Sequence, residues 1–189
     1  METFRRPIVV TTTFGKTYYG DIDVPTESIR TTDLLNSNSI FWNDPNEKCF
    51  DNAILIHDAK LALEEKAIYK KFNKIQLKSS EIIFFFDNYE TIGDKQEKAR
   101  AVVMRNKAQE KMKPVTIITP LIANSFYDIK GKFYGLFKKK SQDKFIPLFD
   151  ASVTEIKKVD NKWSQKRVHL AHTFLGISTQ YIEALSFED

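Results

Sequence analysis

The chain has 189 residues, a mass of 22.0 kDa, 42% hydrophobic and 29% charged residues, and a formal net charge of +4. This balance predicts a folded core in one ordinary domain or two small ones, and it excludes collagen-like and wholly disordered chains. Only six glycines are present, which argues against glycine-rich phosphate-binding loops. Aromatic residues make up 13% of the chain, fifteen of them phenylalanine, and favour packed sheets.

No apolar segment is long enough to cross a membrane as a helix. The longest strictly apolar run is residues 82–86, against the roughly 20 residues that a spanning helix needs. Near the start, residues 8–13 are β-branched and too short and polar for the core of a secretion signal. Cys49 is the single cysteine and closes no disulfide within the chain, as is typical of a reducing compartment. We therefore expect a cytoplasmic protein without membrane insertion.

Short β-type segments follow one another on both sides of one helical stretch. In the first half they span residues 8–13, 16–24, 40–42, 53–63, 69–77 and 81–86. In the second half they span residues 115–121, 131–138, 144–157, 167–175 and 181–187. Between them, residues 94–113 lack Pro and Gly and are rich in Lys, Gln, Glu, Ala and Met, which predicts the one long helix.

This arrangement predicts a mainly β fold with two small β-barrel-like repeats joined by one α-helix. Residues 1–88 form the expected first barrel unit, residues 89–113 the basic helical connector and residues 114–189 the second barrel unit.

The predicted helix carries the whole net charge. Residues 94–113 hold seven basic and three acidic side chains, whereas the rest of the chain holds 22 of each sign. At about 100° per residue its apolar side chains form no clean stripe. The helix is therefore either a solvated connector or a surface that docks on nucleic acid, an acidic protein or anionic lipid. Its candidate binding residues are Lys95, Lys98, Arg100, Arg105 and Lys107.

Three short segments recur in the same order in the two halves. The matching pairs are residues 19–22 with 134–137, residues 51–59 with 143–151 without a gap, and residues 79–83 with 178–182. This order favours an internal duplication over chance similarity between strands rich in Phe and Ile. In the gapless pair, Asp58 and Asp150 each end an apolar run, where a carboxylate accepts backbone N–H groups and turns the chain.

Two motifs resemble catalytic ones without completing them. Gly15, Lys16 and Thr17 resemble the end of a phosphate-binding loop, but the motif needs a glycine where Val10 stands. Asp21 and Asp23 share one face of a strand, where paired carboxylates bind a metal or transfer protons. A solvated strand face explains this pair better, because the second half has no equivalent carboxylates.

Histidine and cysteine offer no further chemistry. His169 and His172 point to opposite faces of a strand, and with His57 they do not form the convergent set that zinc requires. Cys49 has no base beside it in sequence, and the G-x-S-x-G elbow of serine hydrolases is absent from the sequence. We therefore expect no enzyme activity, no metal and no cofactor.

The segment of residues 29–37 is more distinctive. Thr32 or Asp33 is expected to cap a short turn whose two leucines pack onto the barrel. Arg30 is expected to pair with Asp33, and Asn36 to end the turn in a left-handed conformation. The segment is either a structural plug or a recognition site, and its candidate binding residues are Arg30, Thr32, Asp33 and Asn36.

The order of these motifs resembles a bacterial domain family of unknown function. The residues that carry the resemblance are 20–24, then 30–36, then 54–59 and a strand near Ile82. Members of that family pair a G-x-(I/V)-x-V strand with an R-x-(S/T)-D-x-L-N signature and a later D-A. The resemblance covers about residues 7–87 and implies a small barrel, similar in size to an Sm-like fold. It does not indicate an activity. An insert at residues 39–50 and the lack of the R-x-(S/T)-D signature after Gly135 depart from the pattern.

Taken together, the sequence predicts a non-enzymatic protein–protein interaction or assembly module of a bacterial cytoplasmic complex. Small barrels expose sheet edges and loops to which a partner strand adds. The alternative is an RNA- or DNA-binding protein that uses the basic helix and stacks bases on aromatic side chains such as Tyr18, Tyr19, Phe133 and Tyr134. Interaction with a protein is favoured because the charge outside the predicted helix balances to zero, whereas nucleic-acid binders usually carry a basic face across the domain. The sequence identifies neither the protein partner nor the oligomeric state.

Overall fold

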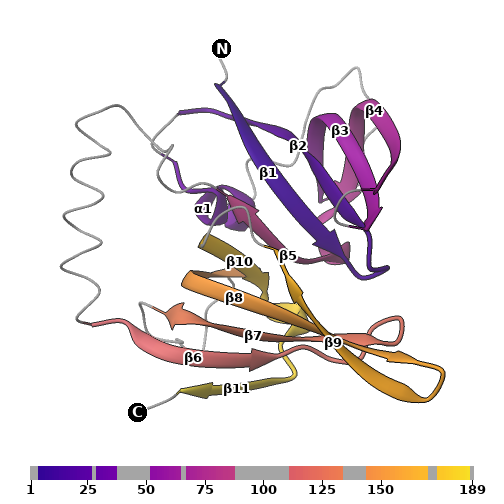
Figure 1. Ribbon diagram of the computed structural model, residues 1–189. Helices are drawn as coiled ribbons and strands as arrows, with labels where there is room; N and C mark the ends of the chain where they lie inside the picture. Colours follow the sequence, from indigo (N-terminus) through magenta and orange to yellow (C-terminus); the bar gives the residue numbers. More distant parts are fainter. Residues whose placement is uncertain are drawn as a thin grey trace.

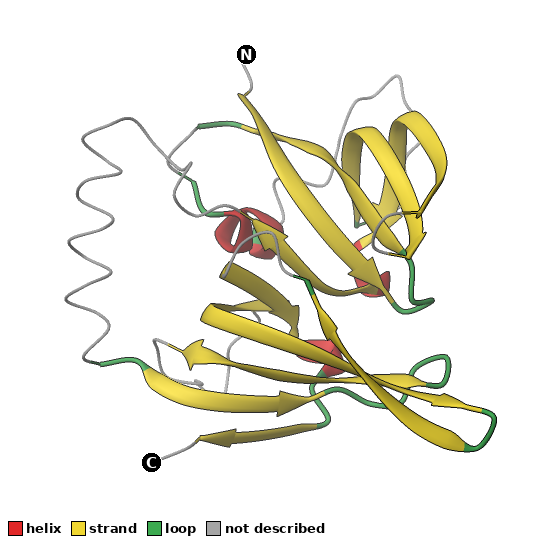
Figure 2. Ribbon diagram, in the orientation of Figure 1, coloured by secondary structure: helices red, strands yellow, loops and turns green. Residues whose placement is uncertain are grey.

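A computed structural model of the chain describes residues 4–26, 29–37, 52–64, 67–87, 111–133, 144–169 and 174–187. These residues are mainly β, as the sequence predicts, with one short α-helix and two 3-10 helices among them (Figures 1 and 2). No helix in these ranges is long and apolar enough to span a bilayer. Most of the predicted basic helix, and the predicted strand at residues 40–42, lie outside the described residues. At the end of that predicted helix, Lys111 lies in a turn and a strand begins at Lys113.

The first half of the chain contains five strands and the α-helix. In chain order the elements are β1 (Phe4–Thr12), β2 (Thr17–Val24), α1 (Thr31–Asn36), β3 (Ala53–Glu64), β4 (Ala67–Lys78), the 3-10 helix η1 (Ser79–Glu81) and β5 (Ile82–Asp87). The second half contains six strands. They are β6 (Lys113–Ile118), β7 (Ser125–Phe133), β8 (Phe145–Val159), β9 (Lys162–Val168), β10 (Phe174–Ser178) and, after the 3-10 helix η3 (Thr179–Tyr181), β11 (Ala184–Phe187).

The eleven strands of the described residues belong to one antiparallel sheet. Their order is β11-β6-β7-β8-β10-β5-β1-β2-β3-β4, with β9 paired to β8 beside this path. The sheet passes from one half of the chain to the other where β5 pairs with β10, and Figure 1 shows these two strands between the two groups. The expected mainly β class is confirmed, but the described strands form one sheet that is not closed into a barrel, so the expectation of two barrel-like units is wrong in this respect. Within the described residues the sheet is open, and β11 and β4 are its two ends.

The order of pairing is the same in the two halves. In the first half β1, β2, β3 and β4 pair in succession, and β5 returns to pair with β1. In the second half β6, β7 and β8 pair in succession, β8 pairs along its length with β10 and β9, and β11 returns to β6. In the first half Val10 of β1 lies between Tyr18 of β2 and Phe85 of β5. In the second half Ile117 of β6 lies in the same way between Ile129 of β7 and Leu185 of β11.

Both long strands that follow the first hairpin contain a bulge at an Asp-Ala pair. Asp58 in β3 has φ of 48° and Asp150 in β8 has φ of 50°, and the ladder shifts opposite each, at Gly20 and at Gly131. These aspartates therefore lie inside strands, and the expectation that they form turns of the chain is wrong. Aspartate is one of the few residues other than glycine that tolerates this left-handed backbone, and the bulge bends the strand.

A glycine lies opposite each bulge, where the backbones approach closely, and the approach is tighter at Gly20 than at Gly131. A Cβ atom on Gly20 would lie 2.5 Å from the carbonyl oxygen of His57. A Cβ atom on Gly131 would lie 3.2 Å from the carbonyl oxygen of Phe149. Gly131, and not Gly135 as the predicted pairing of residues 19–22 with 134–137 implies, is thus the structural counterpart of Gly20.

The strand β5 separates two buried apolar clusters. Phe85 belongs to the cluster of the first half, where it packs edge to face against Phe145 with ring centroids 5.4 Å apart. Phe84 and Phe86 point to the opposite face and belong to the cluster of the second half. Because β5 is buried on both faces, polar and apolar residues do not alternate along it. This explains the uninterrupted apolar run at residues 82–86.

Candidate functional site

A groove of about 510 Å³ lies between the two halves of the chain. One wall is the β1–β2 turn, residues 13–16, together with Leu63 near the end of β3. The other wall comes from the loop before β7 and from side chains of β7, β8 and β9, among them Tyr127, Glu155 and Lys166. A smaller cavity of about 90 Å³ continues from it and shares these three side chains. We refer to this feature as the inter-half groove.

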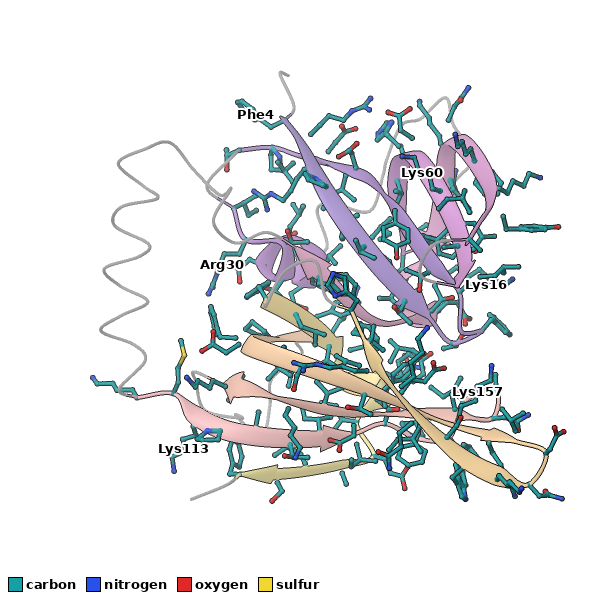
Figure 3. The ribbon with its side chains drawn as sticks, viewed as in Figure 1. Phe4, Lys16, Arg30, Lys60, Lys113 and Lys157 are labelled. Atoms are coloured by element: carbon teal, nitrogen blue, oxygen red, sulfur yellow. The ribbon has the colours of Figure 1, made fainter. Side chains whose placement is uncertain are left out.

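Lysines from both halves line the inter-half groove. Lys16 comes from the β1–β2 turn, Lys157 from β8 and Lys166 from β9. Figure 3 shows Lys16 and Lys157 at the same end of the molecule, on the first and second halves respectively. Among the described lining residues Glu155 is the only carboxylate, so the groove has a net positive charge. An anionic ligand is therefore the electrostatic complement of this surface.

Exposed apolar side chains accompany these lysines. Phe14 is 67% exposed and Leu63 is 55% exposed, and both line the groove. Trp163 of β9 is also 54% exposed, but it faces Lys158 and packs against Phe126 on the face of β8 and β9 opposite to Lys157 and Lys166, so it does not line the groove. Large exposed apolar groups with a polar rim are typical of binding surfaces.

Tyr127 lies at the buried side of the groove. Its ring packs edge to face against Phe84 at 5.0 Å, and its backbone N–H donates to Thr119 Oγ1 at 2.9 Å. Burial raises the pKa of Tyr127 well above its ordinary value, and the negative charge of Glu155 raises it further. The phenol is therefore neutral at physiological pH.

The α1 segment does not line the inter-half groove. Arg30 and Asp33 pair with each other through two hydrogen bonds of 2.5 and 2.9 Å, as the sequence predicts. Both side chains are about half exposed. Thr32 is buried, and its hydroxyl oxygen has no hydrogen-bond partner among the described residues.

Asn36 ties α1 to the second half of the chain. Its side-chain amide donates to the carbonyl oxygen of Phe145 and accepts from the N–H of the same residue, both at 2.8 Å. The amide thus satisfies two backbone groups at the start of β8. These contacts favour a structural role for the segment over recognition.

The predicted caps of this segment are wrong. Arg30 is the N-cap of α1, and no side chain caps the helix there, because the Asp33 carboxylate is bonded to Arg30 instead of to a backbone N–H. The C-cap is Ser37, whose backbone is extended at φ of −78°, and Asn36 is the last helical residue. The buried Leu34 and Leu35 are positioned as expected, in the core of the first half.

The remaining predicted binding residues are Lys95, Lys98, Arg100, Arg105 and Lys107, which all lie outside the described residues. Of the aromatic residues expected to stack on bases, Tyr18 and Phe133 are buried in the two apolar clusters. Tyr19 lines the smaller cavity, and Tyr134 lies outside the described residues. Burial of Tyr18 and Phe133 removes them as stacking platforms.

A polar cluster on β1, β2 and β3 was not recognised from the sequence. His57 Nε2 lies 2.8 Å from Asp23 Oδ2, and Arg5 lies 3.4 Å from Asp23 and 3.1 Å from Asp58. Asp23 is therefore in an ion-pair network and not on a simple solvated face. These contacts link β1, β2 and β3. Among the described residues no group of three or more His, Cys, Asp or Glu side chains is placed to hold a metal ion.

The comparisons with known proteins add no identification. Neither the protein-family models, nor the curated proteins, nor the solved structures contain a match to this chain.

Proposed function

We propose that this chain is a non-enzymatic protein–protein interaction module of a bacterial cytoplasmic complex, and that it binds an acidic segment of its partner in the inter-half groove. The observation that carries the proposal is the joining of Lys16 from one half with Lys157 and Lys166 from the other around exposed Phe14 and Leu63. Ammonium groups pair with carboxylates, and apolar side chains bury their surface against the partner.

The groove also contains groups that suit the alternative function, nucleic-acid binding. Its lysines and the exposed ring of Phe14 are groups that contact phosphates and bases. The protein partner is favoured because two of the aromatic residues expected to stack on bases are buried, and because basic and acidic residues balance outside residues 94–113.

We also infer that the two halves arose by duplication of one small β unit. The similar pairing order, the bulges at Asp58 and Asp150 and the facing glycines support this inference. The relation of residues 7–87 to the bacterial domain family rests on the sequence motifs alone and is part of the proposal.

A binding measurement on the purified full chain tests the groove. The probes are a labelled peptide of alternating Glu and Leu and a labelled single-stranded oligonucleotide, each titrated at about physiological salt. In the variant K16Q/K157Q/K166Q we expect peptide affinity to fall about tenfold or more, because charge-assisted contacts are lost.

A matched control removes the same charge from other faces. K60Q/K113Q/K130Q changes three exposed lysines of β3, β6 and β7 that do not line the groove, and its peptide affinity should stay within about twofold of wild type. Equal losses of peptide affinity in the two variants would show that the effect comes from net charge and not from the groove. Oligonucleotide binding that is tighter than peptide binding and is lost only in the groove variant would replace the proposal by its alternative.

A further inference from the structure

The strands β7, β8 and β9 have a second face, opposite to the one that lines the inter-half groove. Side chains alternate along a strand, and residues that pair directly across two strands share a face. The register of these strands therefore places three rows of side chains on this second face, which we call the outer face. The rows are Asp128 with Thr154 and Arg167, Phe126 with Ile156 and Gln165, and Lys158 with Trp163.

Trp163 is the most prominent aromatic side chain of the outer face. It is 54% exposed, although two neighbours hold its indole in place. The ring of Phe126 packs edge to face against it with centroids 5.8 Å apart, and the Lys158 ammonium lies 5.8 Å from its ring centroid. An aromatic ring fixed in this way loses little conformational freedom when a flat ligand stacks on its exposed surface.

The charges of the β8–β9 hairpin leave its outer face positive. From residue 154 to residue 168 the hairpin contains five basic and two acidic residues. Glu155 lines the groove and Asp160 lies in the turn between the strands, so neither carboxylate is in the three rows. Lys158 and Arg167 are in these rows, and both are exposed. A locally basic face thus exists although the charges of the chain outside residues 94–113 balance.

Asp128 of β7 is the one carboxylate in the three rows. Two strand spacings, about 10 Å, separate it from Arg167 of β9, and Thr154 of β8 lies between them. One of the two carboxylate oxygens of Asp128 is buried. The positive charge of the outer face is therefore concentrated on β8 and β9.

Along β9 the outer face presents three different chemical groups in succession. Trp163, Gln165 and Arg167 are two residues apart, so neighbouring members of this series are about 7 Å from each other along the strand. An indole stacks on a base, an amide forms hydrogen bonds with a base edge, and a guanidinium pairs with a phosphate. A single strand of nucleic acid offers bases and phosphates at short, regular intervals and so complements this series.

We propose that the outer face binds single-stranded nucleic acid, with a base stacked on Trp163 and phosphates paired with Lys158 and Arg167. A duplex is a poor ligand, because its bases already stack on one another and do not reach the indole. An acidic peptide complements the two cations but offers no regular series of flat rings. This surface is separate from the inter-half groove, and the proposal does not depend on what the groove binds.

A titration of the full chain with a labelled oligo(dT) of about twelve nucleotides, followed by fluorescence anisotropy, tests the proposal. In W163A we expect affinity to fall about tenfold or more, because base stacking is lost, whereas W163F should retain most of the affinity. The control K60Q removes an exposed lysine of β3 and should bind within about twofold of wild type. Thermal melting of each variant checks that the fold is intact.

The salt dependence of binding tests the two cations. In K158Q/R167Q the slope of log affinity against log salt concentration should decrease by about 1.4, since each phosphate contact to a single strand contributes about 0.7. K60Q/K113Q is the matched control, because it removes two exposed lysines that lie outside the three rows. Its slope should stay close to that of wild type.

Tryptophan fluorescence distinguishes stacking from a contact with phosphates alone. The chain has two tryptophans, so W42F leaves Trp163 as the only one. Its emission should be quenched as the oligonucleotide saturates the protein, because a stacked base quenches an indole.

Three results would overturn the proposal: no binding of the oligonucleotide by wild type up to about 100 µM, equal affinities of wild type and W163A, or a duplex that binds as tightly as the single strand. A Glu–Leu peptide whose affinity depends on Trp163, while that of the oligonucleotide does not, would make the outer face a protein-binding surface instead. W163A should still bind the peptide, and the groove variant K16Q/K157Q/K166Q should still bind the oligonucleotide. These two variants separate failure of this inference from failure of peptide binding in the groove.

Discussion

Gly176 of β10 faces Phe85 of β5, and the ring of Phe85 occupies the space that a side chain at position 176 would fill. On its own side of the strand Phe85 also contacts Phe145 of β8. An aromatic ring laid over a glycine covers backbone that would otherwise be poorly packed. This pair therefore holds the junction at which one sheet passes between the two halves.

Replacing Gly176 by alanine should weaken this junction. The new Cβ atom overlaps the Phe85 ring, and overpacking of this kind costs about 1–3 kcal/mol of unfolding free energy. Urea unfolding measures the loss. In G176A/F85L the smaller side chain relieves the overlap, so the double variant should lose less than the sum of the two single variants. Strictly additive losses would show that the two residues do not contact each other as described.

The two glycines opposite the bulges should differ in their tolerance of alanine. At Gly20 the added Cβ atom meets the His57 carbonyl oxygen at 2.5 Å, and backbone cannot move aside cheaply. At Gly131 the nearest atom is 3.2 Å away, so a small displacement is enough. We expect G20A to reduce the unfolding free energy by about 1–3 kcal/mol and G131A by less than about 1 kcal/mol. The reverse order in urea unfolding would contradict this account of the bulges.

The α1 segment should depend on Asn36 more than on its ion pair. N36A leaves the N–H and the carbonyl of Phe145 without their partners, which costs about 1–3 kcal/mol. D33A removes an ion pair whose side chains are both about half exposed, and such pairs contribute about 0–1 kcal/mol. Thermal or urea unfolding of the two variants decides the order. A D33A protein with unchanged stability but no peptide binding would make this segment a recognition site.

Tyr127 should make the protein less stable at alkaline pH. Its folded-state pKa is raised by burial and by Glu155, whereas the unfolded chain releases the phenolic proton near the ordinary value of 10.0. The protonated Tyr127 therefore adds its full contribution to the free energy of unfolding below about pH 10. This contribution is lost as the pH rises from there towards the folded-state pKa. The slope reaches about 1.4 kcal/mol for each pH unit.

Y127F removes this titration and should flatten the fall in stability between about pH 10 and about pH 11 in urea unfolding. Y69F changes an exposed tyrosine of β4 and should follow the wild type. Identical slopes in wild type and Y127F would mean that the alkaline loss comes from other groups.

Much of the local structure follows from the sequence alone. Period-two and β-branched segments predict β3 over residues 53–63, and the strand is found at Ala53–Glu64. The gapless alignment of Asp58 with Asp150 pairs two residues that both sit in left-handed bulges. Arg30 and Asp33 are three positions apart in the sequence, so a single turn of backbone brings their side chains together. These features depend on backbone conformation and on neighbours a few residues away, which a single sequence displays directly.

Other predicted strands differ in their bounds from the observed ones, because local sequence patterns do not show where a strand is interrupted. The predicted strand at residues 167–175 spans the end of β9 and the start of β10, which pair with different parts of β8. The predicted strand at residues 131–138 overlaps only the last three residues of β7, which ends at Phe133. The inter-half groove was not predicted at all, since Lys16 and Lys166 become neighbours only after the sheet is assembled.

The sequence by itself determined that this chain is mainly β, where most strands begin, and that residues 82–86 have no polar face. It did not determine which strand lies beside them. The choice of β10 as the neighbour of β5, and with it one open sheet in place of two closed barrels, was decided by tertiary packing. The physical reason is that the glycine at 176 and the ring at 85 complement each other only when residues about ninety positions apart are brought into register.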